Sequence, residues 1–218
     1  RQKMKKFRLS SAPLLVILPL LALTLQGCVE MAVVGAGAAV MSAADRRATG
    51  AQVDDEGIEL RSTNRVSERF GDKVHVNITS YNRSVLITGE VPDAGTRSEI
   101  EKIVSDTPNV RSVTNDLQVA AGTSLSSRAN DATITGKVKA RFVDANQFNA
   151  FHVKVVTENS AVYLMGIVTD AEAAAATEVA RTTGGVRKVV KVFEYCKPTD
   201  AACAPKQSAE DPKKKSGS

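Results

Sequence analysis

Polar and apolar residues alternate along two short segments of the chain, residues 74–78 and 151–155. An alternation with period two is typical of a strand that buries one face. A polar turn follows each segment, and each turn leads into a longer apolar stretch that ends at Gly89 or Gly166. The pattern therefore predicts two strand pairs, each joined by a short turn.

Apolar residues precede each of these strand pairs, four positions apart in the second repeat and more loosely, six and four positions apart, in the first. This spacing predicts an amphipathic helix that turns one face toward a core. The residues expected to face the core are Leu60, Val66 and Phe70 in the first helix and Ile134, Val138 and Phe142 in the second.

A further helix is predicted after each strand pair. Asp93 and Asp170 are suitable N-cap residues for these helices, which are expected to end near residues 105 and 182. Asn109 and Gly185 follow, where a chain that leaves a helix often adopts a left-handed conformation. Final strands are predicted near residues 110–119 and 186–195, and the connection to them should be right-handed if they pair in parallel.

These elements form an internal repeat. Residues 75–78 match 152–155 and residues 84–94 match 161–171, in both cases 77 positions apart. We therefore predict an α+β fold of two tandem αββαβ domains, at residues 54–120 and 130–196. Each domain is expected to have a three-stranded mixed sheet with two helices packed on one face.

The N-terminal segment has the features of a signal peptide. Basic residues at positions 4–8 precede an apolar run at 14–25, which is shorter than the roughly 20 residues that span a bilayer. The run ends in Leu-Gln-Gly-Cys, which resembles the bacterial lipobox and implies removal of residues 1–27 and lipidation of Cys28. The next residue, Val29, is not aspartate, and by this resemblance the outer membrane is the expected destination.

The remaining segments are expected to have little regular structure. Residues 28–53 are predicted to be an Ala/Gly-rich tether, residues 121–129 a linker and residues 197–218 a disordered tail. Cys196 and Cys203 are either free thiols or joined in a disulfide, and an oxidising compartment favours the disulfide. This segment contains no histidine or further cysteine to complete a zinc site.

The charge of the chain is unevenly distributed. The net charge is +5, but residues 1–27 hold five basic and no acidic side chains, so 29 − 5 = 24 basic residues remain against 24 acidic ones. This balance argues against a nucleic-acid partner. Residues 54–119 have 8 basic and 12 acidic side chains, and residues 130–196 have 8 basic and 7 acidic ones. An anionic surface should therefore repel the first repeat and tolerate the second.

The sequence contains no arrangement typical of a catalytic site. His75 and His152 are the only histidines, and they occupy the same position in the two repeats, out of phase with the apolar residues. We interpret them as exposed strand residues. Gly35-Ala36-Gly37 lacks the strand and helix context of a dinucleotide-binding loop. We expect no enzymatic activity, no cofactor and no metal site.

The repeat resembles the BON domain. Each copy has a strand that ends in Gly-x-Val, a helix, and a final Val-x-x-Val strand. The lipobox followed by Asp45-Arg46-Arg47, Gly50 and Asp54-Asp55 resembles the outer-membrane lipoproteins with two BON domains. This resemblance implies a lipid-anchored protein on the periplasmic face of the outer membrane that binds phospholipid and supports the integrity of that membrane. Thr133 stands where these lipoproteins often have an aromatic residue.

The first helix of the second repeat is the candidate for contact with phospholipid. It contains three cations and no acidic residue between Asp131 and Asp144. If its apolar stripe faces the sheet, Ala140 and Val143 lie on the outer side near the cations, an arrangement suited to the headgroup layer. The alternative is an ordinary helix with a solvated charged face. The candidate phospholipid-binding residues are Thr133, Lys137, Lys139, Ala140, Arg141 and Val143.

Two functions remain open at this stage. The first is a phospholipid-binding lipoprotein that maintains the outer membrane, in which the first repeat recruits envelope or cell-wall-remodelling proteins. The second is an adaptor in which the second repeat meets an acidic protein and only the acyl anchor contacts the membrane. Vesicle binding by the body of the chain distinguishes the two.

Overall fold

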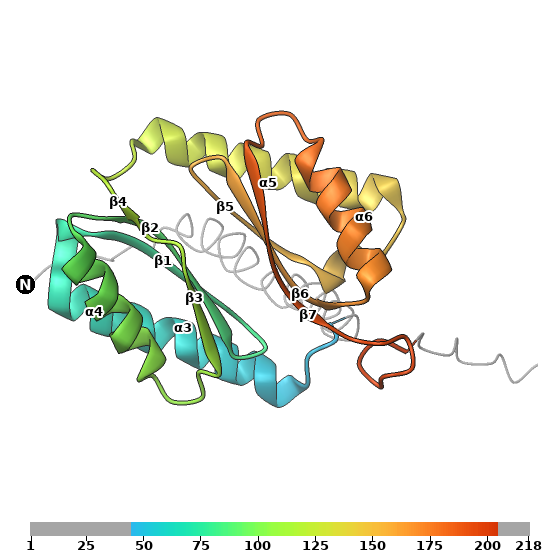
Figure 1. Ribbon diagram of the computed structural model, residues 1–218, viewed down its shortest axis with the longest axis horizontal. Helices are drawn as coiled ribbons and strands as arrows, with labels where there is room; N and C mark the ends of the chain where they lie inside the picture. The colour runs from blue at the N-terminus through green and yellow to red at the C-terminus, as the bar shows by residue number, and fades with distance from the viewer. Residues whose placement is uncertain (1–44, 205–218) are drawn as a thin grey trace, which may run out of the picture. The chain divides into compact units, whose positions relative to one another are not determined.

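The computed structural model describes residues 45–204, which belong to one compact unit that contains both repeats (Figure 1). The first repeat consists of α3 (Thr49–Phe70), the short 3-10 helix η1 (Gly71–Lys73), β1 (His75–Tyr81), β2 (Ser84–Val91), α4 (Ala94–Ser105), β3 (Ser112–Asn115) and β4 (Gln118–Val119). The second repeat consists of α5 (Leu125–Ala145), the 3-10 helix η2 (Ala150–His152), β5 (Lys154–Glu158), β6 (Ala161–Val168), α6 (Asp170–Arg181) and β7 (Lys188–Tyr195).

Each repeat forms a mixed sheet with its second strand in the centre. β2 pairs antiparallel with β1 and parallel with β3 and β4, which follow one another along the same edge. β6 pairs antiparallel with β5 and parallel with β7. The predicted α+β class with mixed sheets is confirmed.

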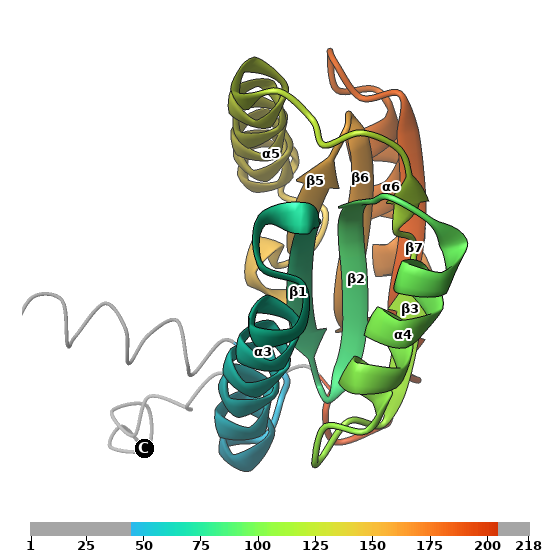
Figure 2. The same cartoon turned by 90° about the vertical axis from the view of Figure 1, so that its left-hand side faces the viewer.

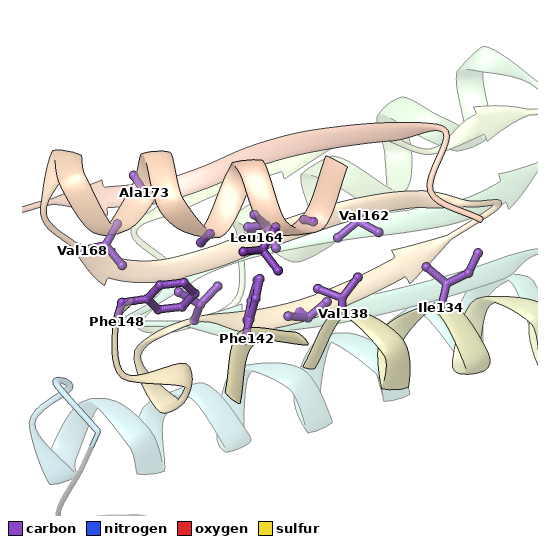
Figure 3. Close-up of a cluster of buried hydrophobic side chains, with 13 residues drawn as sticks. Ile134, Val138, Phe142, Phe148, Val162, Leu164, Val168 and Ala173 are labelled. Carbon is purple, nitrogen blue, oxygen red and sulfur yellow. The ribbon is translucent and has the colours of Figure 1, made fainter. Parts of the chain in front are cut away.

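A hydrophobic core lies between each sheet and its two helices. In the second repeat, Ile134, Val138 and Phe142 of α5 are buried in this core, as their spacing predicts (Figure 3). The rings of Phe142 and Phe148 meet edge to face, with centroids 5.0 Å apart. The core of the first repeat contains Ile58, Val66, Val85, Ile87, Val91, Ile100, Val104 and Leu117.

The two sheets pack against each other through the faces that the helices leave uncovered. The layers follow the order helices, sheet, sheet, helices, as Figure 1 shows. In Figure 2, β1 and β2 are visible in the gap between α3 and α4, which both cover the same face of their sheet. Leu86 of β2 shares a buried cluster with Tyr163, Met165 and Ile167 of β6. The repeats therefore share an apolar interface of their own, separate from the two helix-covered cores.

Polar contacts surround this interface. Tyr163 donates a hydrogen bond to Asp116 at 2.8 Å, and Lys154 lies 3.0 Å from a carboxylate oxygen of Glu59. Glu194 of β7 accepts hydrogen bonds from Arg111 at 2.5 Å and from Asn82 at 2.7 Å. These contacts join residues of the first repeat to residues of the second, so they add directional specificity to the apolar packing.

A buried aspartate on the first helix of each repeat holds the turn between the first two strands. Asp55 of α3 accepts hydrogen bonds from the backbone N–H groups of Asn82 and Arg83, both at 2.7 Å. Asp131 of α5 accepts the equivalent bonds from Asn159 and Ser160 at 2.8 Å. The four turn residues have positive φ, as a type I′ hairpin turn requires. Asp55 and Asp131 therefore each fix the hairpin of their own repeat.

The first helix differs from its prediction. Leu60 is 64% exposed and not part of the core, because the buried face of α3 passes through Asp55, Ile58, Ser62 and Val66. Two of these residues are polar and look like solvent-facing positions in the sequence. Ser62 is nevertheless buried, with its hydroxyl 3.1 Å from that of Thr107.

Several boundaries also differ. α3 begins inside the predicted tether, at Thr49, and α5 begins inside the predicted linker, at Leu125. Within the predicted tail, residues 198–204 form turns. The structure joins Cys196 to Cys203 in a disulfide, with the Cα atoms 6.2 Å apart. The N-cap of α6 is Thr169, one residue before the predicted Asp170.

Candidate functional site

Helix α5 is positioned by its two ends and by its buried face. The Ser124 hydroxyl accepts a hydrogen bond from the backbone N–H of Ser127 at the N-terminus, and Asn146 ends the helix in a left-handed conformation with φ of 47°. Ile134, Val138 and Phe142 pack into the core. Because α5 covers the outer side of its sheet, its opposite face is directed toward solvent (Figure 1).

Five of the six candidate residues lie on this solvent-facing side. Thr133, Lys137, Lys139, Ala140 and Val143 are all exposed, and Val143 has 66% of its surface accessible. At about 100° per residue, Ala140 and Val143 lie opposite Val138, while Lys137 and Lys139 lie on either side of them. The exposed face is thus a narrow apolar ridge with one lysine on each flank. We call it the α5 ridge.

Arg141 does not belong to the α5 ridge. Its guanidinium donates hydrogen bonds to the carbonyl oxygen of Val179 at 2.9 Å and to the hydroxyls of Thr183 at 2.7 Å and Thr182 at 3.1 Å. These partners lie at the C-terminal end of α6, where a cation is favoured by the helix dipole. Arg141 therefore joins the two helices of its own repeat, a role that the local sequence pattern does not reveal.

The electrostatics of the α5 ridge follow from where the acidic residues point. Asp131 is turned inward and its carboxylate is occupied by the hairpin turn. The next acidic residue of the helix, Asp144, is exposed near its C-terminal end. Over the intervening stretch the exposed charges are the two lysines, so this part of the surface is positive.

Phe151 is an exposed aromatic residue that the sequence pattern assigns to a strand. The structure places it in η2, directly after α5, with 53% of its surface accessible. The backbone N–H of Phe151 is bound by the Asn149 side chain at 3.0 Å, which starts the 3-10 turn. An asparagine that can cap such a turn was the available signal for this local structure.

The two histidines are partly buried, which corrects their interpretation as surface residues. Nδ1 of His75 lies 2.9 Å from Oε2 of Glu90, and Nδ1 of His152 lies 3.4 Å from Oε1 of Glu172. His75 is in β1, whereas His152 is in η2 and not in a strand. Burial and the nearby Arg46 lower the pKa of His152 despite Glu172.

Some predictions concern residues outside the described range. The signal peptide, the lipidation of Cys28, most of the tether and residues 205–218 fall in this class. Between residues 45 and 204, no helix combines the length and hydrophobicity needed to cross a membrane.

Comparison with known proteins supports the internal repeat and its resemblance to the BON domain. The BON domain family matches residues 54–121 and 130–197. The chain is 36% identical over 173 residues to the outer membrane lipoprotein DolP of Haemophilus influenzae, covering 78% of this chain and 90% of that protein. It is 32% identical over 153 residues to a 21 kDa hemolysin of Actinobacillus pleuropneumoniae, covering 69% and 79% respectively.

A solved structure of CdsD, a structural protein of the type III secretion system of Chlamydia trachomatis, covers 63% of this chain and 91% of its own, at 13% identity and a TM-score of 0.26. The family match and the relationship to an outer membrane lipoprotein confirm the predicted family and the predicted outer-membrane location. The chain belongs to the BON-domain family, and it carries two copies of that domain.

Proposed function

We propose that this envelope protein binds anionic phospholipid through the α5 ridge of its second BON domain and thereby helps to maintain the outer membrane. The observation that carries the proposal is the exposed Ala140 and Val143 between Lys137 and Lys139, on a stretch of α5 where the first exposed carboxylate is Asp144, one turn beyond Ala140. The lipid anchor expected on Cys28 keeps the domain near the membrane surface, so weak contacts are sufficient.

The chemistry of the ridge suits the headgroup layer. Each lysine near an anionic leaflet contributes about 1 kcal/mol, so the pair contributes about 2 kcal/mol. Val143 adds apolar surface between them, and the shallow ridge can lie in the plane of the interface without spanning it. Arg141 adds little to this contact because its guanidinium is already bound to α6.

The two repeats favour different surfaces. The net charge of residues 54–119 is 8 − 12 = −4, whereas that of residues 130–196 is 8 − 7 = +1. A negative leaflet therefore attracts the second repeat and repels the first. This difference orients the body with α5 toward lipid and leaves α3 and α4 available to protein partners of the envelope.

Sedimentation of the body lacking residues 1–28 with vesicles tests the proposal. We expect binding to phosphatidylglycerol vesicles, little binding to phosphatidylcholine vesicles, and weakening at high salt. Replacing Lys137 and Lys139 with glutamate should reduce binding at least about 30-fold, because more than 2 kcal/mol is lost.

Arg61→Glu with Arg65→Glu is the matched control. Both arginines are exposed on α3, the corresponding helix of the first repeat, and the double substitution makes the same change in charge. It should leave vesicle binding unchanged or weaken it only slightly. Equal losses in the two double variants would show that net charge alone governs binding. Absence of vesicle binding by the unmodified body would favour the adaptor function.

A further inference from the structure

Three potential metal ligands meet where the two repeats adjoin. His75 comes from β1, Glu90 from β2 and Glu158 from the end of β5. One ligand atom from each lies within 4.8 Å of the other two. His75 and Glu90 belong to the first repeat and Glu158 to the second, so this cluster depends on the packing of the two sheets.

The carboxylates of this cluster are buried and lack a strong counter-charge. Glu90 is 4% exposed and Glu158 is 6% exposed. Among residues 45–204, neither forms an ion pair with a lysine or arginine, and His75 is the only basic partner, at 2.9 Å from Glu90. A buried carboxylate is costly unless a cation or several hydrogen bonds compensate for the lost water.

The corresponding histidine of the second repeat has a different carboxylate partner, and that partner is neutralised by an arginine. His152 lies beside Glu172, and there Arg46 binds both carboxylate oxygens, at 2.6 and 2.9 Å. No described arginine or lysine occupies this place beside His75 and Glu90. The cluster around His75 therefore has two carboxylates and no guanidinium, whereas the cluster around His152 has one carboxylate and the guanidinium of Arg46.

Part of the ligand set remains available. Asn77 donates to Oε2 of Glu158 at 2.7 Å, and Thr123 donates to Oε2 of Glu90 through its backbone N–H at 3.1 Å. Within the described part of the chain, no hydrogen bond involves Oε1 of either glutamate. Each carboxylate thus keeps one oxygen for a cation.

A cavity gives access to the cluster. It has a volume of about 440 Å³, and His75 and Glu90 form part of its wall. Lys73 and Arg128 also line the cavity, but neither forms an ion pair with Glu90 or Glu158 within the described range. The cavity leaves room for a water molecule as a fourth ligand.

We propose that His75, Glu90 and Glu158 bind a zinc ion. One imidazole nitrogen and two carboxylate oxygens are a ligand set that zinc accepts, with bonds of about 2.0–2.2 Å, and the cavity supplies the open fourth position. These bond lengths place neighbouring ligand atoms about 3.4 Å apart, so small rotations of the side chains are sufficient. The amide of Asn77, now hydrogen-bonded to Glu158, turns away or presents its oxygen when the ion enters.

Bound zinc would cross-link the two BON domains, because its ligands come from both. This inference concerns the interface of the repeats and does not rest on phospholipid binding by α5. It also differs from the expectation from sequence that neither histidine binds metal.

Zinc binding by the chelator-stripped full chain in detergent micelles tests this inference. Isothermal titration with zinc chloride should show about one ion per chain, and zinc should raise the melting temperature by about 5 °C at a large excess over Kd. His75→Gln and the near-isosteric Glu158→Gln should each weaken binding at least about 100-fold and abolish the thermal shift. Glu158→Gln keeps an acceptor for Asn77, so it tests the ligand even if His75→Gln fails to fold.

His152→Gln is the matched control, since His152 already shares its carboxylate with Arg46. It should bind zinc as tightly as the unmodified chain does. The proposal is overturned if the unmodified chain takes up no zinc, if Glu158→Gln binds zinc with unchanged affinity, or if His152→Gln loses binding equally. Calcium or magnesium binding as tightly as zinc would overturn the assignment of the metal.

Discussion

Arg46 binds Glu172 through both terminal nitrogens of its guanidinium, across 126 residues of sequence. The nitrogen-to-oxygen distances are 2.6 and 2.9 Å, and the same guanidinium donates to the carbonyl oxygen of Ile167 at 2.9 Å. Arg46 precedes α3, whereas Glu172 lies in the first turn of α6 and completes a capping box with Thr169. The segment before the first repeat is therefore bound to the second.

We expect Arg46→Ala to lower the free energy of unfolding by about 2 kcal/mol, because it leaves a largely buried carboxylate without its cation. Arg46→Lys should restore only part of this loss, since a lysine cannot form the bidentate pair. Denaturant titration at neutral pH measures both effects. Arg69→Ala is the control, because its ion pair with Glu99 is exposed, and stability should hardly change. Equal effects of Arg46→Ala and Arg69→Ala would contradict this reasoning.

The same pair predicts how stability depends on pH. Burial raises the pKa of Glu172, but hydrogen bonds from Arg46 and Thr169 outweigh it and lower the pKa from 4.5 to about 2. A carboxyl group with a lowered pKa in the folded state adds stability above its unfolded pKa, and this stability is lost as the pH falls. We expect the free energy of unfolding to decrease as the pH falls from about 4.5 to 2. In Glu172→Gln, the slope of this decrease with pH should be smaller. Thermal unfolding at a series of pH values measures it, and an unchanged slope in Glu172→Gln would exclude Glu172 as its source.

Gly89 should not tolerate a side chain. A Cβ atom there would lie 2.0 Å from the carbonyl oxygen of His75, and the residue has φ of 121°. A Cβ atom at Gly166 would likewise lie 2.3 Å from the carbonyl oxygen of His152. We expect Gly89→Ala to destabilise the protein by more than about 3 kcal/mol and Gly166→Ala by a similar amount.

Gly136→Ala is the control for the glycine substitutions. Gly136 lies within α5 with open space around the position of a Cβ atom, so alanine should raise stability by about 0.5–1 kcal/mol. Melting temperatures of the three variants test the contrast. Retention of normal stability by Gly89→Ala would mean that the strands do not approach as closely as described.

Asp131→Ala should destabilise the second repeat. The substitution removes the acceptor for the backbone N–H groups of Asn159 and Ser160, and we expect a loss of about 2–3 kcal/mol. Amide hydrogen exchange should accelerate first at this turn. Asp144→Ala, on the exposed part of the same helix, should leave both stability and exchange almost unchanged, and any comparable effect there would argue against the role of Asp131.

The predictable parts of this fold are those that local periodicity determines. Ile134, Val138 and Phe142 are apolar, evenly spaced and buried, so helix α5 and its orientation could be predicted from the sequence, together with the exposure of Lys137 and Lys139. Leu60 was assigned wrongly because the buried side of α3 contains Asp55 and Ser62. The partners of these two polar residues are remote in sequence, and only tertiary structure brings them together.

The candidate site shows the same limit. Arg141 has the spacing of a surface cation, but threonines about forty residues later bind its guanidinium. The cluster around His75 depends on the pairing of β1 with β2 and, for Glu158, on contact between the repeats. Periodicity identifies which side of a helix is exposed to solvent. The hydrogen-bond partners of a polar side chain depend instead on how distant segments of the chain are brought together.

The sheet-to-sheet contact makes the duplicated domains mutually dependent. Leu86 on one sheet and Tyr163 and Met165 on the other are buried only while both halves are present. A single repeat produced alone would expose this apolar face to water and would tend to self-associate. During divergence of the gene, a change on one inner face would need a compensating change on the other, so the halves evolve as a matched pair.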